Sequence, residues 1–287
     1  MPRALLTSSD GVHAPEFRQI VRTLITDGGR NEISRSHVYI LCDAMREYKF
    51  WHRHRKIKEV MESLVLLGIC IDNVRPCWLF QPNLKNLVPR SETSEYSRPH
   101  TLLSVSIVQA MHPGDVVYIM GGNCHALCEA GRSNPGVQVI DCLRSKILAD
   151  ELTLVSYSAG TTACGASIKH TRDKYDSLET HIPGSAYSSQ GLALLGPWWD
   201  FAVHVELNNR AHRTWWQSFF ERKPHLRFGS QTWIVPLANG SAAAFMKDAE
   251  TCHAEFTQAC NEEMRAKLGR WMNWFNDSVE LASIVMQ

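Results

Sequence analysis

The stretch VSYSAGTT, Val155–Thr162, joins an apolar, β-branched run to a turn of small residues, and Ser158 stands at the junction. Most serines at the end of a strand only cap a helix or hydrogen-bond locally. A nucleophilic serine is instead presented on a sharp strand–turn–helix elbow, whose geometry demands small neighbours. Both interpretations place Ser158 between a strand and a turn, and the rest of the chain decides between them.

Short apolar runs alternate with amphipathic stretches through the first half of the chain. Lys56–Leu67 carries its apolar residues on one helical face, and this pattern predicts a helix. Alternation of strands and helices predicts a mostly parallel sheet with helices on both faces, which binds ligands at the carboxyl ends of its strands. The runs that predict buried strands are Ala4–Thr7, Val38–Cys42, Gly68–Ile71, Val116–Met120 and Thr153–Ser156.

The composition indicates a globular, cytoplasmic protein. The chain has 287 residues, of which 44% are hydrophobic, and a net charge of +1, so its charge favours neither nucleic acid nor a membrane surface as a partner. It has no run of about 18 apolar residues, and the apolar run at Ala4–Leu6 is too short for a secretory signal. Nine scattered cysteines, an odd number, favour reduced and buried thiols.

Two segments are expected to lie outside the main domain, which we assign to residues 1–246. Residues 81–100 are rich in Pro, Ser and charge, and this composition predicts a surface loop. In residues 247–287, apolar residues recur every three or four positions from Phe256 to Val279, which predicts a helical extension packed on the domain.

Two other motifs are better explained by structure than by chemistry. Arg46–Lys58 interleaves basic and aromatic residues like a nucleic-acid patch, but the neutral net charge favours a solvated face that leads into a crossover helix. Cys124 and Cys128 would share a helix face, yet no second Cys/His pair follows at zinc-site spacing. We therefore expect neither a metal nor a cofactor.

The region around Ser158 combines several features of a nucleophile. The segment GGN, Gly121–Asn123, directly follows a predicted buried strand, so we expect its backbone N–H groups to face a ligand. An oxyanion hole uses such groups together with the N–H of the residue after the nucleophile, here Ala159. His204 ends another apolar run, where a general base could meet Ser158.

Four ordered motifs then resemble the peptidase E (aspartyl dipeptidase) and cyanophycinase family of serine peptidases. They are VVYIMGGNCHAL, VSYSAGTTACGASIKHTRDKYD, QGLALLGPWWDFAVHVE and WIVPLANGSAAA, and the opening ALLTSSDG is similar to that family's first strand and turn. The resemblance spans residues 4–245 without residues 81–100. It implies a three-layer α/β/α sandwich of the class I glutamine-amidotransferase-like type.

The resemblance also implies roles for individual residues. Ser158 matches the nucleophile, His204 the general base and Asp173 the acidic residue of the family. Arg210 resembles the arginine that binds an acidic substrate side chain, and Arg213, one helical turn later, is the alternative. The oxyanion donors would be Gly122 and Ala159, beside Gly121 and Asn123 in the substrate site.

The chain departs from the family at the residue that orients the histidine. A family glutamate appears here as Asn239, which can accept an imidazole N–H but cannot stabilise imidazolium with a charge. The third member of the triad is therefore Asp173 or Asn239. The resemblance implies a serine dipeptidase acting on short peptides with N-terminal aspartate. The alternatives are a cyanophycin-like or isoaspartyl peptidase, an esterase, and a catalytically silent binding protein; the oligomeric state stays open.

Overall fold

The computed structural model describes residues 3–9, 11–13, 15–26, 32–46, 48–80, 99–168, 190–197, 199–203, 233–237, 242–247 and 254–259. The strands of the main sheet are β1 (Arg3–Thr7), β2 (Val38–Leu41), β3 (Val74–Trp78), β4 (Thr101–Leu102), β5 (Val116–Ile119), β6 (Thr153–Tyr157), β9 (Ala242–Lys247) and β10 (Ala254–Ala259). Among the described residues these eight strands lie in the order β10-β9-β1-β6-β5-β2-β3-β4. In this order the six strands β1, β6, β5, β2, β3 and β4 are parallel to one another, whereas β9 and β10 are antiparallel to their neighbours.

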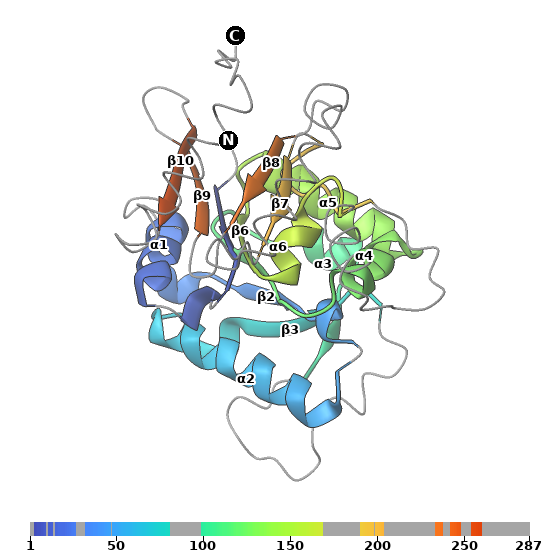
Figure 1. Cartoon of the computed structure of the whole chain (residues 1–287). Coiled ribbons are helices and arrows are strands. Elements are labelled where there is room, and N and C mark those ends of the chain that lie inside the picture. The colour runs from blue at the N-terminus through green and yellow to red at the C-terminus, as the bar shows by residue number, and fades with distance from the viewer. Residues whose placement is uncertain are drawn as a thin grey trace, which may run out of the picture.

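Helices cover both faces of this sheet, as the alternation of elements predicts (Figure 1). The α-helices are α1 (Pro15–Thr26), α2 (Phe50–Leu66), α3 (Val105–Gln109), α4 (Cys124–Arg132), α5 (Gly136–Leu148) and α6 (Ala159–Cys164), with short 3₁₀ helices η1 (Gly11–His13), η3 (Ile33–Arg35), η4 (Asp43–Met45) and η5 (Ile71–Asn73). Apolar residues of α1 and α2 pack on one face, and those of α3 to α6 pack on the other. The predicted three-layer α/β/α arrangement with a mostly parallel sheet is confirmed.

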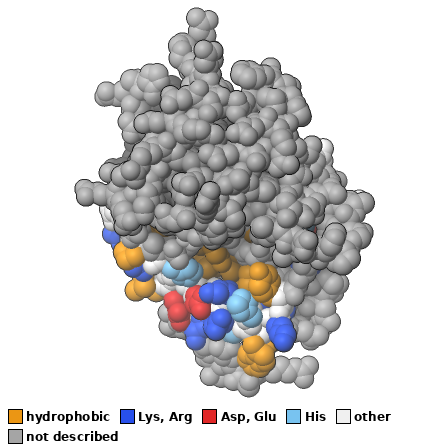
Figure 2. All heavy atoms as spheres, viewed as in Figure 1, with side chains coloured by type: hydrophobic (Ala, Val, Ile, Leu, Met, Phe, Trp, Pro, Cys, Tyr) orange, Lys and Arg blue, Asp and Glu red, His pale blue; other side chains and the backbone are white. Residues whose placement is uncertain are grey.

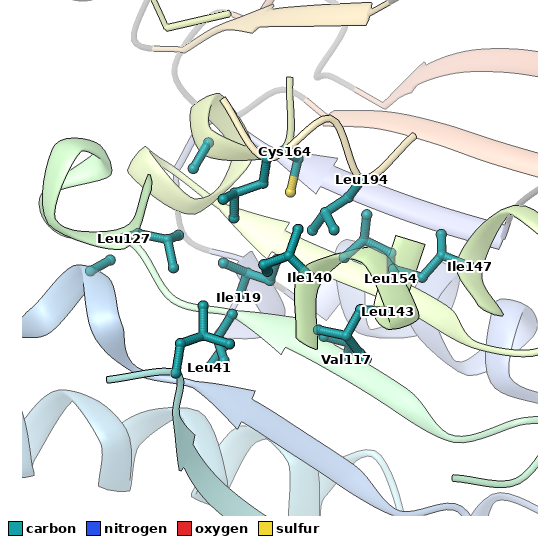
Figure 3. Packing of buried hydrophobic residues seen from close by; sticks show 14 of the residues in the cluster. Leu41, Val117, Ile119, Leu127, Ile140, Leu143, Ile147, Leu154, Cys164 and Leu194 are labelled. Carbon is teal, nitrogen blue, oxygen red and sulfur yellow. The ribbon is translucent and has the colours of Figure 1, made fainter. Parts of the chain in front are cut away.

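Strand β5 shows how one continuous apolar run serves two cores. Successive side chains of a strand point to opposite faces. Val116 and Tyr118 accordingly join the core under α1 and α2, whereas Val117 and Ile119 join the core under α4 and α5. Figure 3 shows the second core, in which Leu127, Ile140 and Leu143 of the helices meet side chains of the sheet. A strand buried on both faces needs apolar residues at every position, which explains why these runs do not alternate with polar residues.

The sequence predicts four of the parallel strands and one crossover helix at nearly the observed positions. The runs beginning at Ala4, Val38, Val116 and Thr153 form β1, β2, β5 and β6. The amphipathic stretch Lys56–Leu67 overlaps α2, which begins earlier, at Phe50, and ends one residue sooner, at Leu66. The basic and aromatic segment Arg46–Lys58 leads into this helix and, from Phe50 on, forms its first part.

The prediction of a strand at Gly68–Ile71 is wrong. Gly68 has φ +100° and lies in the turn that ends α2, a conformation that glycine adopts with little strain. The strand follows it, as β3 at Val74–Trp78. Arg75 and Pro76 interrupt the apolar run of β3, and proline is normally excluded from central strands, so the sequence pattern hides this strand.

The predicted helix of the C-terminal segment is wrong where the structure describes it. Residues 254–259 form β10, which pairs with β9, and Phe256 stands opposite Phe245 in the register. The expected boundary after residue 246 falls inside β9, so the sheet continues past it. Pairing with a free sheet edge outweighs a helical spacing of apolar residues. The rest of 247–287 and most of the predicted loop 81–100, residues 81–98, lie outside the described residues.

The structure describes a second sheet, whose strands pair with each other rather than with the main sheet. It consists of β7 (Trp199–Ala202) and β8 (Trp233–Pro236), which run parallel, with Ala202 opposite Pro236. In Figure 1 this pair lies beside α6. Among the helices that are described, none has both the length and the hydropathy of a membrane span.

Candidate active site

Ser158 lies on a strained elbow between β6 and α6. Its φ of 52° and ψ of −125° fall in a region that non-glycine residues rarely adopt. Such a conformation costs about 1–3 kcal/mol and persists where the surrounding structure holds it, commonly at active sites. The elbow is tight because Gly160 has no side chain: a Cβ there would lie 2.6 Å from the carbonyl oxygens of Ile119 and Met120. The strand–turn–helix geometry expected for a nucleophile is present.

A buried hydroxyl network holds the elbow from below. The Ser158 backbone N–H donates to the Thr7 carbonyl at 2.9 Å, and the Thr161 hydroxyl donates to the same oxygen at 2.9 Å. The Thr161 hydroxyl also contacts Ser156 Oγ at 2.8 Å, and the Thr7 hydroxyl donates to the Ser156 carbonyl at 3.2 Å. Thr7, Ser156 and Thr161 are fully buried, so these bonds join β1, β6 and α6 away from water.

The structure brings Gly121 and Gly122 to the elbow. A Cβ on Gly121 would lie 3.0 Å from Ser158 Cβ, so this glycine packs directly against the candidate nucleophile. Gly122 has φ +141°, and a Cβ there would lie 2.3 Å from the Ala44 carbonyl oxygen of η4. Both positions therefore require glycine, because a larger residue would collide with Ser158 at one and with Ala44 at the other. The loop after β5 is therefore held beside Ser158, where oxyanion donors are needed.

The expectation for Asn123 needs a correction. Its backbone N–H donates to the Ala44 carbonyl at 2.7 Å, so this N–H does not face a ligand. Its side-chain oxygen caps α4 by accepting the backbone N–H groups of His125 at 2.9 Å and Ala126 at 3.3 Å. Asn123 thus begins a helix, a role that asparagine commonly fills.

A family model identifies the chain as a peptidase. The model of peptidase family S51 matches residues 98–250, which include the elbow and the glycine loop. The chain belongs to peptidase family S51. One similar solved structure is a peptidase from an acI-B1 Actinobacterium, with 18% identity, a TM-score of 0.49 and coverage of 85% of this chain and 83% of that chain. The search of curated proteins finds no match.

The S51 elbow has a second neighbour, Tyr157, that the sequence does not single out. A Cβ on Gly121 would lie 2.8 Å from Tyr157 Cε2, so the ring packs against the glycine loop. Burial raises the pKa of Tyr157 to about 12, although a hydrogen bond with the Gly121 backbone acts in the opposite direction. The ring also meets the edge of His13, with centroids 6.4 Å apart. The Tyr157 ring therefore packs against Gly121, next to Ser158, and its phenol is neutral.

Asp200 of β7 anchors the segment that follows α6. Its Oδ1 accepts the Ser167 backbone N–H at 2.6 Å, and a Cβ on Gly165 would lie 3.1 Å from the same oxygen. Burial raises the pKa of Asp200 to about 6, although hydrogen bonds from the backbone of Ser167 and Ala166 lower it. Its signal in the sequence is an acidic residue inside the apolar run WDFAV.

Five residues predicted for the S51 site lie outside the described residues: Asp173, His204, Arg210, Arg213 and Asn239. The segments before two of them are described. β7 ends two residues before His204, and β8 ends three residues before Asn239. β7 and β8 run parallel, so their carboxyl ends lie at the same edge of this sheet.

Proposed function

We propose that the chain is a serine peptidase that hydrolyses short peptides with an N-terminal aspartate. The observation that carries this proposal is the backbone of Ser158, whose φ of 52° and close packing against Gly121 match a nucleophile elbow. A serine that only capped α6 would need no such strain, and Ser158 makes no side-chain cap hydrogen bond to that helix. Membership of a peptidase family supplies the class of reaction.

The proposed chemistry is acyl transfer to Ser158. Its Oγ attacks the peptide carbonyl carbon while His204 takes the hydroxyl proton, and His204 returns that proton to the leaving amine. Water then attacks the acyl-enzyme in the same way and releases the second product. The backbone N–H groups of Gly122 and Ala159 would stabilise the negative charge on the carbonyl oxygen in both steps. Asp173 or Asn239 would orient His204.

Specificity for aspartate is proposed for Arg210, with Arg213 as the alternative. A guanidinium offers two parallel donors that match a carboxylate. Losing such a contact costs about 2–5 kcal/mol, so Arg210→Ala should lower kcat/KM for Asp-X dipeptides about 30-fold or more. Its reaction with a small uncharged ester should barely change. Equal cleavage of Asp-X and Ala-X dipeptides by the wild type would rule out the aspartyl specificity and leave the serine hydrolase intact.

Two variants test the mechanism. Ser158→Ala and His204→Ala should each abolish hydrolysis, and the double variant should be no worse than either, because the two groups act as a unit. A Ser158→Ala protein that keeps most of its activity would rule out the mechanism. A panel of Asp-X, β-Asp-X and ester substrates separates the dipeptidase from an isoaspartyl or cyanophycin-like peptidase and from an esterase.

One sequence observation favours a second candidate, a catalytically silent binding protein. Asn239 stands where the family has a glutamate, and it carries no charge that could stabilise an imidazolium. Such a protein would bind peptides without hydrolysing them. Reaction with a fluorophosphonate, which requires an activated serine, distinguishes the two candidates.

A further inference from the structure

We propose that Arg53 forms a subsite for a carboxylate of the peptide substrate, three to four residues away from the scissile bond. This inference rests on the proposed peptidase function and adds a second point of recognition to it. The subsite lies at the beginning of α2, beside the carboxyl ends of β2 and β3.

Arg53 stands on a rigid aromatic platform. Its guanidinium carbon lies 5.5 Å from the centroid of the Trp78 ring and 6.0 Å from that of Phe50. Trp78 is fully buried at the end of β3, and its indole N–H donates to His100 Nδ1 at 2.8 Å. A guanidinium over aromatic faces is attracted to them and keeps its N–H edge available for an anion. The platform therefore holds the charge in one place before a ligand arrives.

The hydrogen-bonding capacity of Arg53 is almost unused in the described part of the chain. A guanidinium has five N–H donors. The described contacts use one of them, from Nη1 to the Arg46 carbonyl at the long distance of 3.5 Å. No carboxylate of the described residues forms an ion pair with Arg53, whereas Arg46 pairs with Glu129 and Arg55 pairs with Glu59.

The Arg53 guanidinium is half-buried, beside a histidine that is neutral near pH 7. Burial lowers the pKa of Arg53, because removal from water disfavours the charged form of the guanidinium. Burial first, and then the charges of Arg53 and His54, lower the pKa of His100 to about 4. Figure 2 shows basic, acidic, histidine and hydrophobic side chains together on the described part of the surface shown in that view. An incoming carboxylate would supply the missing partner of this half-buried cation.

The sheet topology gives the separation between the strand end next to Ser158 and the strand end at Trp78, on which Arg53 stacks. In the sheet order, β6, β5, β2 and β3 are consecutive and parallel, so their carboxyl ends share one edge. Three strand spacings of about 4.8 Å separate the ends of β6 and β3 by about 14 Å. An extended peptide covers about 3.5 Å per residue, so about four residues span that distance. A dipeptide is too short to contact both sites.

The test compares peptides that differ only in one carboxylate. We would measure kcat/KM for Asp-Ala-Ala-Ala-Ala as the free acid, as the C-terminal amide, and as the amide with Glu at position four, with Asp-Ala as the short control. The first two peptides isolate the terminal carboxylate, and the third offers a side-chain carboxylate instead. The variants are Arg53→Gln, Arg53→Lys and the matched control Arg55→Gln, which removes a more exposed arginine of the same helix.

Arg53→Gln should lower kcat/KM for at least one carboxylate peptide by about tenfold or more, as expected for a partly buried charge pair. It should leave the plain amide and Asp-Ala within about twofold. Arg53→Lys should restore part of the loss, because a point charge replaces a fork, and Arg55→Gln should have no effect. An equal change on all four peptides, or no change on any, would overturn the subsite.

The two proposals fail in distinguishable ways. Hydrolysis that survives Ser158→Ala contradicts the peptidase mechanism, whereas Ser158-dependent hydrolysis with no Arg53 effect contradicts only the subsite. Calorimetric titration of Ser158→Ala with the acid and amide peptides measures their affinities without hydrolysis, and so reports the contribution of the subsite to binding. There, replacing Arg53 by Gln should abolish any preference for the acid, and a preference that persists would overturn the assignment.

Discussion

Ser158 and Thr7 are joined across two adjacent strands by a single hydrogen bond, from the Ser158 backbone N–H to the Thr7 carbonyl at 2.9 Å. The partner strand thus fixes the backbone of the candidate nucleophile. The same carbonyl accepts the Thr161 hydroxyl, so one oxygen of β1 holds both the elbow and the first turns of α6. The strained backbone at Ser158 is thus held by fully buried groups of β1, β6 and α6.

This arrangement predicts that Thr161→Val is destabilising. The substitution keeps the shape and leaves Ser156 Oγ without its 2.8 Å partner, which costs about 1–3 kcal/mol of unfolding free energy. Looser support of the elbow should also slow fluorophosphonate labelling of Ser158 by about tenfold. Urea denaturation and labelling kinetics measure the two effects.

The same helix provides a control for the Thr161 variant. The Thr162 hydroxyl is buried and, among the described residues, has no hydrogen-bond partner. Thr162→Val should therefore be neutral or stabilising, because it removes a polar group that is buried without compensation. If the two variants lost equal stability, the hydroxyl network would have no special role.

A second prediction concerns the glycine loop. Gly122→Ala should destabilise the protein by at least about 2 kcal/mol, because the new Cβ meets the Ala44 carbonyl and the backbone has positive φ. Gly68 has φ +100° but only ordinary contacts around a Cβ, so Gly68→Ala should cost about 1 kcal/mol from strain alone. Thermal unfolding of both variants measures the difference, and equal losses would show that the close approach to η4 is unimportant.

The third prediction follows from the buried carboxyl of Asp200. Its pKa of about 6 in the folded protein is higher than in the unfolded chain, about 4. The folded protein therefore takes up this proton first, and the contribution of Asp200 to stability rises as the pH falls from about 6 toward 4 and is lost as the pH rises through 6.

Asp200→Asn removes this titration while keeping an oxygen that can accept the Ser167 N–H. The free energy of unfolding of the variant, relative to wild type, should be higher at pH 7 than at pH 4.5 by about 2 kcal/mol. Urea titrations at the two pH values measure it. A difference that does not change with pH would show that Asp200 keeps an ordinary pKa in the folded protein.

A fourth prediction addresses the residue that orients His204. Asp173 can stabilise an imidazolium by its charge, whereas Asn239 can only accept an N–H from the ring. We expect Asp173→Asn to lower kcat far more than Asn239→Ala. The reverse ranking would give the role to Asn239, and an effect of neither would indicate a Ser–His dyad.

Sequence reasoning succeeded where one local pattern determines the structure. The apolar runs of β2 and β5 are buried on both faces of the sheet. The tight elbow at Ser158 accepts only small residues beside it, and the sequence has them. Sequence reasoning failed where pairing with a distant segment determines the structure. Pro76 makes β3 unlike a strand in its sequence, and β10 forms a strand because it pairs with the edge of β9.

The supporting residues of the site are the least visible in the sequence. Tyr157, Asp200 and Arg53 gain their roles from contacts with residues far along the chain, namely Gly121, Ser167 and Trp78. The position of Asn123 after a buried strand predicts a backbone N–H that faces a ligand, but the same position begins α4, where Asn123 is the N-cap. Motifs identify the reacting group, and the fold supplies the groups that hold it.

The most direct test of the central claim is fluorophosphonate labelling of the folded protein, with the modified residue located by mass spectrometry. The elbow predicts one rapid modification, on Ser158, that disappears in Ser158→Ala and in His204→Ala. A folded wild type that stays unlabelled, or labelling that persists in Ser158→Ala, would contradict it.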